Sequence, residues 1–340
     1  MMETIYNPLI SFCIPTYNRS NKVYDLVLSI LKYSGTDIEI IVLDNCSTDN
    51  TKELLIGIED DRLNYICNTI NIGSILNIIK VITEAKGLFS FLCLDKDFID
   101  YREIDNLIKR IREDNQIILG YCAQNLNEGK KDEIYDMGFE SVLNMAYSAK
   151  HPSGYFYKTD LYKNSKIVEQ LLKEGSSFEF NFELINAEMS FYGKSKVINL
   201  PLFFTETKSD CAKIPSFTYS KSNLYFEPQK RYKEFLVYIK NAYTLELNEK
   251  EIFELVKVLY YKALASSTIG YKSILADQSV CLHHGIMPRK VGIFELIQIN
   301  IKFTDWFVKE KIPIKLLPKF KILFFAHVRT IYYIIKEIIK

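Results

Sequence analysis

The sequence lacks the features that mark secreted, membrane-spanning and nucleic-acid-binding proteins. Its first residues have no basic segment followed by an apolar core, so we expect no signal peptide. The charge-free stretch 63–79 is broken by four asparagines and a glycine, and we do not expect it to span a membrane. The 43 Lys and Arg residues balance 42 Asp and Glu, so no positive field favours nucleic acid as a partner.

The cysteine and glycine patterns exclude several common sites. The seven cysteines include no C-x-x-C pair, their number is odd, and several lie in apolar runs, which is typical of reduced, buried thiols. The chain has no G-x-G-x-x-G and no G-x-x-x-x-G-K-[ST], so it has neither a dinucleotide fingerprint nor a P-loop. Its 48% hydrophobic and 25% charged residues indicate a globular protein, which we expect in the cytoplasm.

Short apolar segments alternate with amphipathic helical patterns near the start of the chain. Strands are predicted at 9–14, 38–43, 63–67 and 88–94, with helices at 22–32, 51–56 and 73–85. We expect Pro15 to stop the first strand, Ser20 or Asn21 to cap the first helix, and Asn50 with Glu53 to form a capping pair. This alternation predicts an α/β fold with a mostly parallel sheet flanked by helices.

Polar clusters follow three of these strands, at residues 16–19, 44–49 and 95–97. Because parallel strands end on the same edge of a sheet, the three clusters should share one rim. Asp95 and Asp97 come directly after a buried strand, and two converging carboxylates favour a divalent cation such as Mg²⁺ or Mn²⁺. The alternative is a solvated Asp-x-Asp turn. The rim suits a nucleotide, whose base, ribose and pyrophosphate need amides or carboxylates, hydroxyls and a metal.

Four motifs in this order and spacing resemble glycosyltransferase family 2. They are Ser11–Arg19, Ile41–Thr51, Asn71–Gly73 with Asn77, and Phe91–Asp97. The resemblance covers about the first 120 residues and is strongest to sugar transferases of bacterial O-antigen and capsule clusters. It implies a GT-A fold, which is Rossmann-like, and a nucleotide-sugar donor.

The resemblance also implies roles for individual residues. Those expected to bind the donor are Pro15, Thr16, Asn18, Arg19, Asp44, Asn71, Gly73, Asp95 and Lys96. Asp44 would accept a hydrogen bond from the base, most often uracil, and Asp97, with Asp95, would bind the metal. The alternatives are a helix cap for Asp44, a packed polar residue for Asn77 and a solvated charge for Arg19.

The sequence departs from the family pattern at three positions. Asn45 stands where the family often has a second Asp, and Phe98 where it often has an acid. Lys96 lies between the two acids of the D-x-D. Its ammonium group would either contact the donor phosphates, which we favour, or weaken the metal site.

The acceptor side is expected to follow the donor site in the chain. In the family, a strand with Gly and aromatic residues lines the acceptor pocket, which implies His151, Gly154 and Tyr155 here. The alternative for His151 is a satisfied turn residue. An inverting transfer needs a general base, and the acids of a helix near 176–184 are candidates: Glu179, which we prefer, then Glu183, with Glu188 as a third choice. Each of these acids could equally be a surface helix residue.

Long helical patterns dominate from about residue 220 onward. We therefore expect a catalytic domain at 1–219, with nucleotide-sugar binding in 1–120 and the acceptor side in 121–219, and a helical appendage at 220–340. Residues 301–340 hold nine Lys and Arg against three acids, with many aromatic and aliphatic residues between them. Such a segment suits the surface of an anionic membrane, and a helix pair with a basic outer face is the alternative.

Together these patterns predict a metal-assisted, inverting transferase of bacterial surface polysaccharide synthesis. Its partners would be a nucleotide-sugar donor, UDP-sugar first, and a glycan acceptor on a lipid carrier, at the inner face of the cytoplasmic membrane. One rival is a sugar nucleotidyltransferase, which would need a Gly-rich basic loop after the first strand. Another is an inactive family member that acts as an assembly subunit.

Overall fold

The computed structural model describes residues 8–123, 131–148, 150–175, 181–204, 224–313 and 316–339. The chain divides into two units, Met1–Glu206 and Thr207–Lys340. The expected boundary between residues 219 and 220 lies in the stretch 205–223, outside the described residues, so it stays a prediction.

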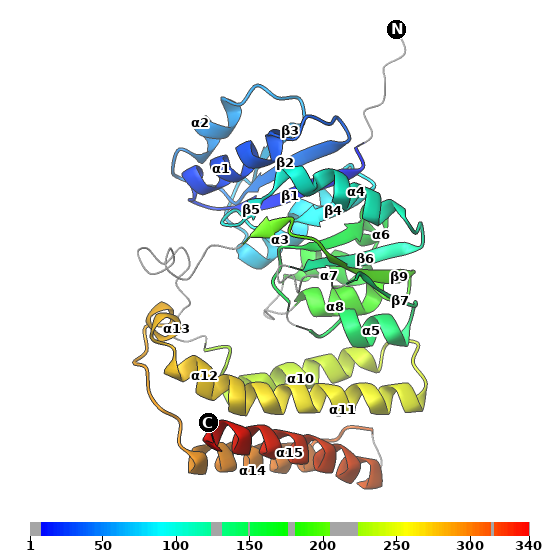
Figure 1. Ribbon diagram of the computed structural model, residues 1–340, viewed down its shortest axis with the longest axis vertical. Helices are drawn as coiled ribbons and strands as arrows, with labels where there is room; N and C mark the ends of the chain where they lie inside the picture. Colours follow the sequence, from blue (N-terminus) through cyan, green and yellow to red (C-terminus); the bar gives the residue numbers. More distant parts are fainter. Residues whose placement is uncertain are drawn as a thin grey trace. The chain divides into compact units, whose positions relative to one another are not determined.

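A mixed sheet organises the first unit (Figure 1). Its described strands run in the order β3-β2-β1-β4-β8-β6-β9-β7. Their bounds are β1 (Ile10–Thr16), β2 (Ile38–Asp44), β3 (Leu63–Cys67), β4 (Phe89–Leu92), β6 (Ile117–Ala123), β7 (Glu133–Tyr135), β8 (Tyr155–Lys158) and β9 (Lys194–Asn199). Only the pairs that involve β8 or β7 are antiparallel, so the predicted mostly parallel sheet is confirmed within the described strands. A separate antiparallel pair joins β5 (Phe98–Ile99) to β10 (Phe203–Phe204).

Helices cover both faces of this sheet. They are α1 (Ser20–Leu31), α2 (Thr51–Ile56), α3 (Ser74–Thr83), the short η1 (Tyr101–Glu103), α4 (Ile104–Arg112), α5 (Phe139–Met145), α6 (Thr159–Lys163), α7 (Lys166–Glu174) and α8 (Asn181–Met189). Successive residues of a strand point to opposite faces. Phe12 of β1 therefore packs into a core with α1 and α4, and Cys13 packs into the opposite core with α3 and α8.

The first strand runs further than expected. The prediction that Pro15 stops it was wrong, because Pro15 is paired with Leu43 of β2, and Thr16 with Asp44. A proline lacks only its own N–H donor, so it removes one bond from the ladder without ending the strand. The carbonyl oxygen of Thr16 accepts a bond from the Asn45 N–H at 2.9 Å, which ties the ends of β1 and β2 together.

The expected helix caps were also wrong. Helix α1 begins at Ser20, so its N-cap position is Arg19 and not Ser20 or Asn21, and the Arg19 side chain makes no capping hydrogen bond. Asn50 does occupy the N-cap position of α2, but its side chain makes no capping hydrogen bond either. Both helices are capped by Asp49 instead. Its Oδ2 accepts from the Ser20 N–H of α1 at 3.0 Å, and its Oδ1 accepts from the Thr51 N–H of α2 at 3.1 Å. One carboxylate thus fixes the starts of two helices next to the rim of the sheet.

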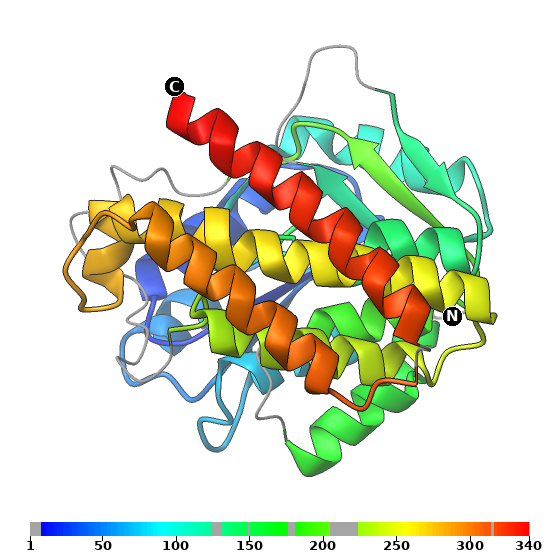
Figure 2. The same ribbon diagram turned by 90° about the horizontal axis from the view of Figure 1, so that it is seen from below.

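The second unit is helical, as the sequence predicts (Figure 2). Its described elements are α10 (Pro228–Ala242), α11 (Glu249–Ala265), the π-helical turn η2 (Ser266–Gly270), α12 (Tyr271–Ala276), α13 (Gln278–His283), α14 (Ile293–Lys309) and α15 (Leu316–Ile339). Buried aromatic rings of α10, α11 and α14 pack in its centre, with Tyr260 contacting Phe235, Phe303 and Phe307. Among the described helices, none has the length and apolarity needed to cross a bilayer.

Candidate active site

Hydrogen bonds join the polar loops after β1 and β2. The Asn18 N–H donates to the Ser47 hydroxyl at 2.8 Å, and the Asn18 side-chain oxygen accepts from the Thr48 N–H at 2.8 Å. Asn18 has a φ of 52°, a left-handed conformation that asparagine tolerates better than most residues. These bonds hold residues 16–20 against residues 44–49, as the convergence of parallel strand ends predicts.

Asp95 connects the loop after β4 to the same rim. Its carboxylate accepts from the Thr16 hydroxyl at 2.9 Å and from the Arg19 guanidinium at 2.6 Å. The Asp95 side chain is almost fully buried and that of Arg19 is about one-fifth exposed. Burial raises the pKa of Asp95, and the positive charge of Arg19 opposes that rise. Arg19 is therefore fixed by an ion pair, so it is not the solvated surface charge that was the alternative.

Asp97 lies buried beside the acceptor-side residues. Its Oδ2 accepts a hydrogen bond from the Ser153 hydroxyl and lies 3.7 Å from Nδ1 of His151. Ser153 also accepts from the Leu94 N–H at 2.9 Å, so it bridges the strand end and the carboxylate. Burial and the nearby charge of Lys96 lower the pKa of His151 to about 4, which keeps the imidazole neutral at pH 7.

The two acids suit a divalent cation. Mg²⁺ is usually bound by one or two carboxylates together with substrate phosphates, and Asp95 and Asp97 supply that number. Asp95 accepts from Arg19 and Thr16, and Asp97 accepts from Ser153, so both carboxylates already have partners within the protein. The structure describes no group of three or more His, Cys, Asp or Glu side chains arranged around a metal position within the residues it covers.

Asp44, the expected partner of the base, ends β2 and is buried. Its Oδ1 accepts from the Ser47 N–H at 2.9 Å and from the Ser47 hydroxyl at 2.6 Å. Its Oδ2 accepts from the Tyr65 hydroxyl at 2.7 Å. Asp44 thus stabilises a turn and does not cap a helix, since α2 begins only at Thr51. The side-chain contacts from Ser47 and Tyr65 were not anticipated from the sequence.

Buried asparagines link the ends of β2 and β3 to α3. Asn45 donates to the Asn71 side-chain oxygen at 2.9 Å, and Asn68 donates to that of Asn77 at 2.8 Å. Asn77 in turn donates to the Leu43 carbonyl oxygen at 3.0 Å. Lys80 donates to the Asn68 side-chain oxygen at 2.8 Å. Asn77 is therefore a packed polar residue that supports the loop carrying Asn71.

Gly73 ends that loop at the start of α3. Its φ of +87° favours glycine, and its N–H donates to the Asn71 side-chain oxygen at 2.9 Å. No atom lies within 4 Å of the position a Cβ would occupy, so the backbone conformation and not the available space selects glycine here.

The acceptor-side residues lie around β8. Gly154 has a φ of +101°, and a Cβ there would lie 2.6 Å from the Phe203 ring and 2.7 Å from the Cys122 carbonyl oxygen. The ring of His151 stacks on that of Phe203 at 6.4 Å between centroids. Tyr155 is only 1% exposed and packs against Tyr121 in the core. His151 thus lies close to Asp97, and Gly154 directly follows Ser153, which donates to Asp97, whereas the Tyr155 ring is buried in the core.

The candidate bases differ in what surrounds them. Glu179 lies outside the described residues. Glu183 is buried in the first turn of α8. The pKa of Tyr155 is raised mainly by the burial of Tyr155 and, second, by the negative charge of Glu183. Glu188 accepts from the Ser165 and Tyr192 hydroxyls and from the N–H groups of Lys166 and Ile167, so it caps α7. That structural role leaves Glu183 and Glu179 as the candidates.

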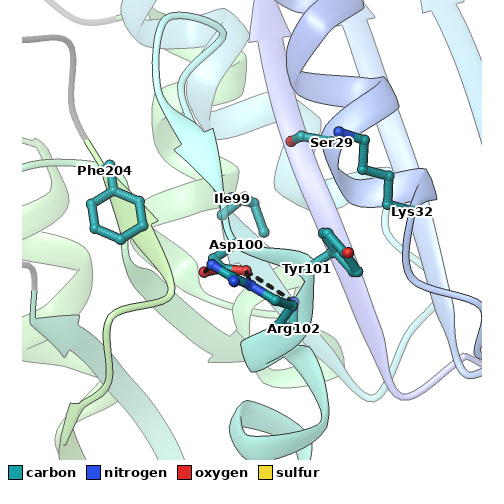
Figure 3. Close-up of a pocket in the computed structure, with 7 residues that line it drawn as sticks. All are labelled: Ser29, Lys32, Ile99, Asp100, Tyr101, Arg102 and Phe204. Atoms are coloured by element: carbon teal, nitrogen blue, oxygen red, sulfur yellow. Dashed lines mark hydrogen bonds and ion pairs between the residues drawn. The ribbon is translucent and has the colours of Figure 1, made fainter.

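The first unit also contains a cavity of about 350 Å³ (Figure 3). It is lined by Ser29, Lys32, Ile99, Asp100, Tyr101, Arg102 and Phe204. Arg102 turns back onto Asp100, with 2.6 Å between the ion-pair atoms. None of the residues expected to bind donor, metal or acceptor lines this cavity.

Slightly less than half of this chain matches a known family model. Residues 11–168 match the model described as Glycosyl transferase family 2. An uncharacterized glycosyltransferase of Rickettsia typhi is 25% identical over 58% of this chain and 65% of its own length. TuaG of Bacillus subtilis, named for teichuronic acid biosynthesis, is 33% identical over 32% and 42%. A GalNAc(5)-diNAcBac-PP-undecaprenol beta-1,3-glucosyltransferase of Campylobacter jejuni is 25% identical over 54% and 62%. The chain thus spans less than two thirds of each of these relatives.

Solved structures give the same fold. TarS of S. aureus superposes with a TM-score of 0.57 at 15% identity, covering 87% of this chain and 49% of that chain. A structure of TarS residues 1–349 in complex with UDP-GlcNAc superposes with a TM-score of 0.52 at 13% identity, covering 88% and 92%. At these identities the likeness concerns the fold alone, which is the GT-A fold.

Proposed function

Since residues 11–168 match the model of glycosyltransferase family 2, we propose that this protein transfers a sugar from a nucleoside-diphosphate sugar to a hydroxyl group of a growing bacterial surface polysaccharide. The observation that carries the proposal is that hydrogen bonds join three polar loops next to the buried Asp97. Thr16 and Arg19 of the first loop donate to Asp95, and Asn18 of the same loop bonds to Ser47 and Thr48 of the second. We favour UDP as the nucleotide, which the UDP-GlcNAc complex of TarS supports. The undecaprenol-linked substrate named for the Campylobacter relative supports a lipid-linked acceptor.

Asp97 and Asp95 would hold Mn²⁺ or Mg²⁺ against the donor diphosphate. The cation would neutralise the charge that develops on the leaving diphosphate. Arg19 is held by Asp95 at the rim, where its guanidinium can contact a phosphate while keeping its ion pair. Lys96, between the two acids, adds a second positive charge to the same loop.

We propose an inverting transfer with Glu183 or Glu179 as general base. A base must reach the acceptor hydroxyl and take its proton as the sugar is attacked. His151 and Gly154 would form the acceptor side next to Asp97. Glu183 is buried, and its charge acts on Tyr155, which follows Gly154 in the chain. Glu183→Gln and Glu179→Gln are compared. The variant that removes the base should lower kcat by about 100-fold or more without raising the Kd for the donor.

Nucleotide binding tests the donor site directly. We expect UDP with Mn²⁺ to raise the melting temperature of the full chain, since a ligand that binds only the folded state stabilises it. Asp97→Asn should remove the Mn²⁺-dependent part of the shift and abolish turnover. Asp61→Asn, at an exposed acid before β3, is the matched control and should retain both. No shift with any nucleoside diphosphate would favour the inactive assembly subunit over the enzyme.

A further inference from the structure

The outer side of α14 exposes a row of large apolar side chains. Phe294, Ile297, Ile301 and Val308 are 47–80% exposed. Their spacing of three, four and seven residues places them on one face of the helix. The opposite face holds the buried Leu296, Ile299, Phe303 and Phe307. The helix is therefore apolar on two sides, and only one of them is needed for the core of its unit.

The outer side of α15 carries a second such row. Phe320, Phe324, Val328 and Ile331 are 50–74% exposed and are spaced by four, four and three residues. The buried Ile322, Leu323 and Ala326 lie on the other side of this helix. Soluble monomers rarely expose contiguous apolar patches larger than a few hundred Å², so two such rows on adjacent helices indicate a binding surface.

Hydrogen bonds hold the two helices together. His327 of α15 is 2.8 Å from the Thr304 hydroxyl and 3.1 Å from the side-chain oxygen of Asn300, both on α14. Figure 2 shows α14, in orange, and α15, in red, side by side in front of α10 and α11. Phe307 of α14 and His327 of α15 both contact Tyr260 of α11, so both helices bury the side that faces α11. The two rows lie on the side away from α11, which we call the outer face.

The charges around the outer face are mainly positive. Lys302 and Lys321 are exposed on the same two helices, and the exposed Lys309 already pairs with Asp305 at 2.7 Å. Arg329 is not part of this face, because its guanidinium lies 4.6 Å from the centre of the Tyr261 ring of α11. If two copies of the chain met symmetrically through this face, these cations would face one another and repel. An anionic lipid surface instead offers acyl chains for the apolar rows and phosphate groups for the cations.

We propose that the outer face of α14 and α15 docks on an anionic lipid bilayer, with both helices lying in the plane of the membrane surface. The purpose of docking rests on the proposed function, because it would bring the enzyme to a lipid-linked acceptor. The binding itself depends only on the second unit.

The test is flotation of the full-length protein with vesicles of phosphatidylcholine alone or with phosphatidylglycerol added. We expect binding to the anionic vesicles that weakens with rising salt. Phe294→Ser and Phe324→Ser should each lower the affinity by about tenfold, since each removes a large apolar side chain from the contact with the acyl chains. Lys302→Glu with Lys321→Glu should reduce binding at low salt. Met137→Ser, at a 60% exposed residue of the first unit, is the control and should bind normally.

Three outcomes would overturn the proposal. The full-length protein does not float with anionic vesicles at low salt, or it binds neutral and anionic vesicles equally. In the third, light scattering shows an oligomer that Phe324→Ser dissociates, which would identify the face as a contact between copies. The fluorescence of Trp306, which lies in α14, is measured on the same samples and separates loss of the fold of the second unit from loss of docking. The UDP-induced melting shift is measured as well, and a protein that binds vesicles but no nucleotide would reject the proposed function alone.

Discussion

At the scale of single residues, Gly154 sets the shape of the chain next to Asp97. Its φ of +101° is unfavourable for other residues, and a Cβ would also overlap the Phe203 ring and the Cys122 carbonyl group. We expect Gly154→Ala to lower the free energy of unfolding by about 2–4 kcal/mol, measured by urea denaturation. Gly175→Ala is the control, because Gly175 also has a positive φ but no atom within 4 Å of the added methyl group. Equal losses in the two variants would mean that the close packing of Gly154 does not matter.

Single residues also mark the limit of what the sequence could predict. Thr16, Arg19 and Asp95 were expected at one site from their positions after neighbouring strands, and they are joined there by hydrogen bonds. The bridging role of Ser153 was not anticipated, because its partner Asp97 lies 56 residues away in sequence. Spacing along the chain indicates which strand ends meet. It does not indicate which hydroxyl completes the hydrogen bonds of a buried carboxylate.

At the scale of elements, most strands and helices were predictable from apolar periodicity. Their caps were not, because Asp49 caps α1 from a loop 29 residues away, and Glu188 of α8 caps the start of α7. A capping pattern in the sequence includes only residues next to the helix. Here the first N–H groups of each helix donate to side chains that the fold brings near from elsewhere in the chain. The same reason explains why Glu188 looked like a candidate base in the sequence.

The asparagine network joins three elements, and its loss should affect donor binding. Asn77→Ala removes the bonds to the Leu43 carbonyl and to Asn68, leaving buried polar groups unpaired at a cost of about 1–3 kcal/mol. Because the network holds the loop of Asn71 and Gly73, we expect the KM for the donor to rise several-fold with a smaller change in kcat. Asn106→Ala, at an exposed residue of α4, should change neither. An unchanged KM in a folded Asn77→Ala protein would show that the network supports stability alone.

The pairing of α14 with α15 should depend on pH through His327. Burial lowers the pKa of His327 below its ordinary value of about 6.5. Between the folded and unfolded pKa values the unfolded chain binds more protons, so stability is full above about pH 6.5 and falls as the pH drops below it. The fluorescence of Trp306, the single tryptophan and part of α14, reports unfolding of this unit. His327→Gln should show a smaller loss of stability between pH 7.5 and 5.5, and an equal loss would assign the effect to other groups.

At the scale of the whole molecule, the two units should respond to different ligands. The residues proposed to bind the donor all belong to the unit Met1–Glu206, and the outer face belongs to Thr207–Lys340. Hydrogen exchange can distinguish the responses of the two units, because a bound ligand slows amide exchange where it suppresses local opening. We expect UDP with Mn²⁺ to protect the loops at 16–20, 44–50 and 94–98 and to leave α14 and α15 unchanged. Anionic vesicles should protect α14 and α15 and leave the three loops unchanged. If UDP alone protected α14 as strongly as the loops, the division into a donor-binding unit and a membrane-docking unit would be wrong, because both ligands would then act on one cooperative structure.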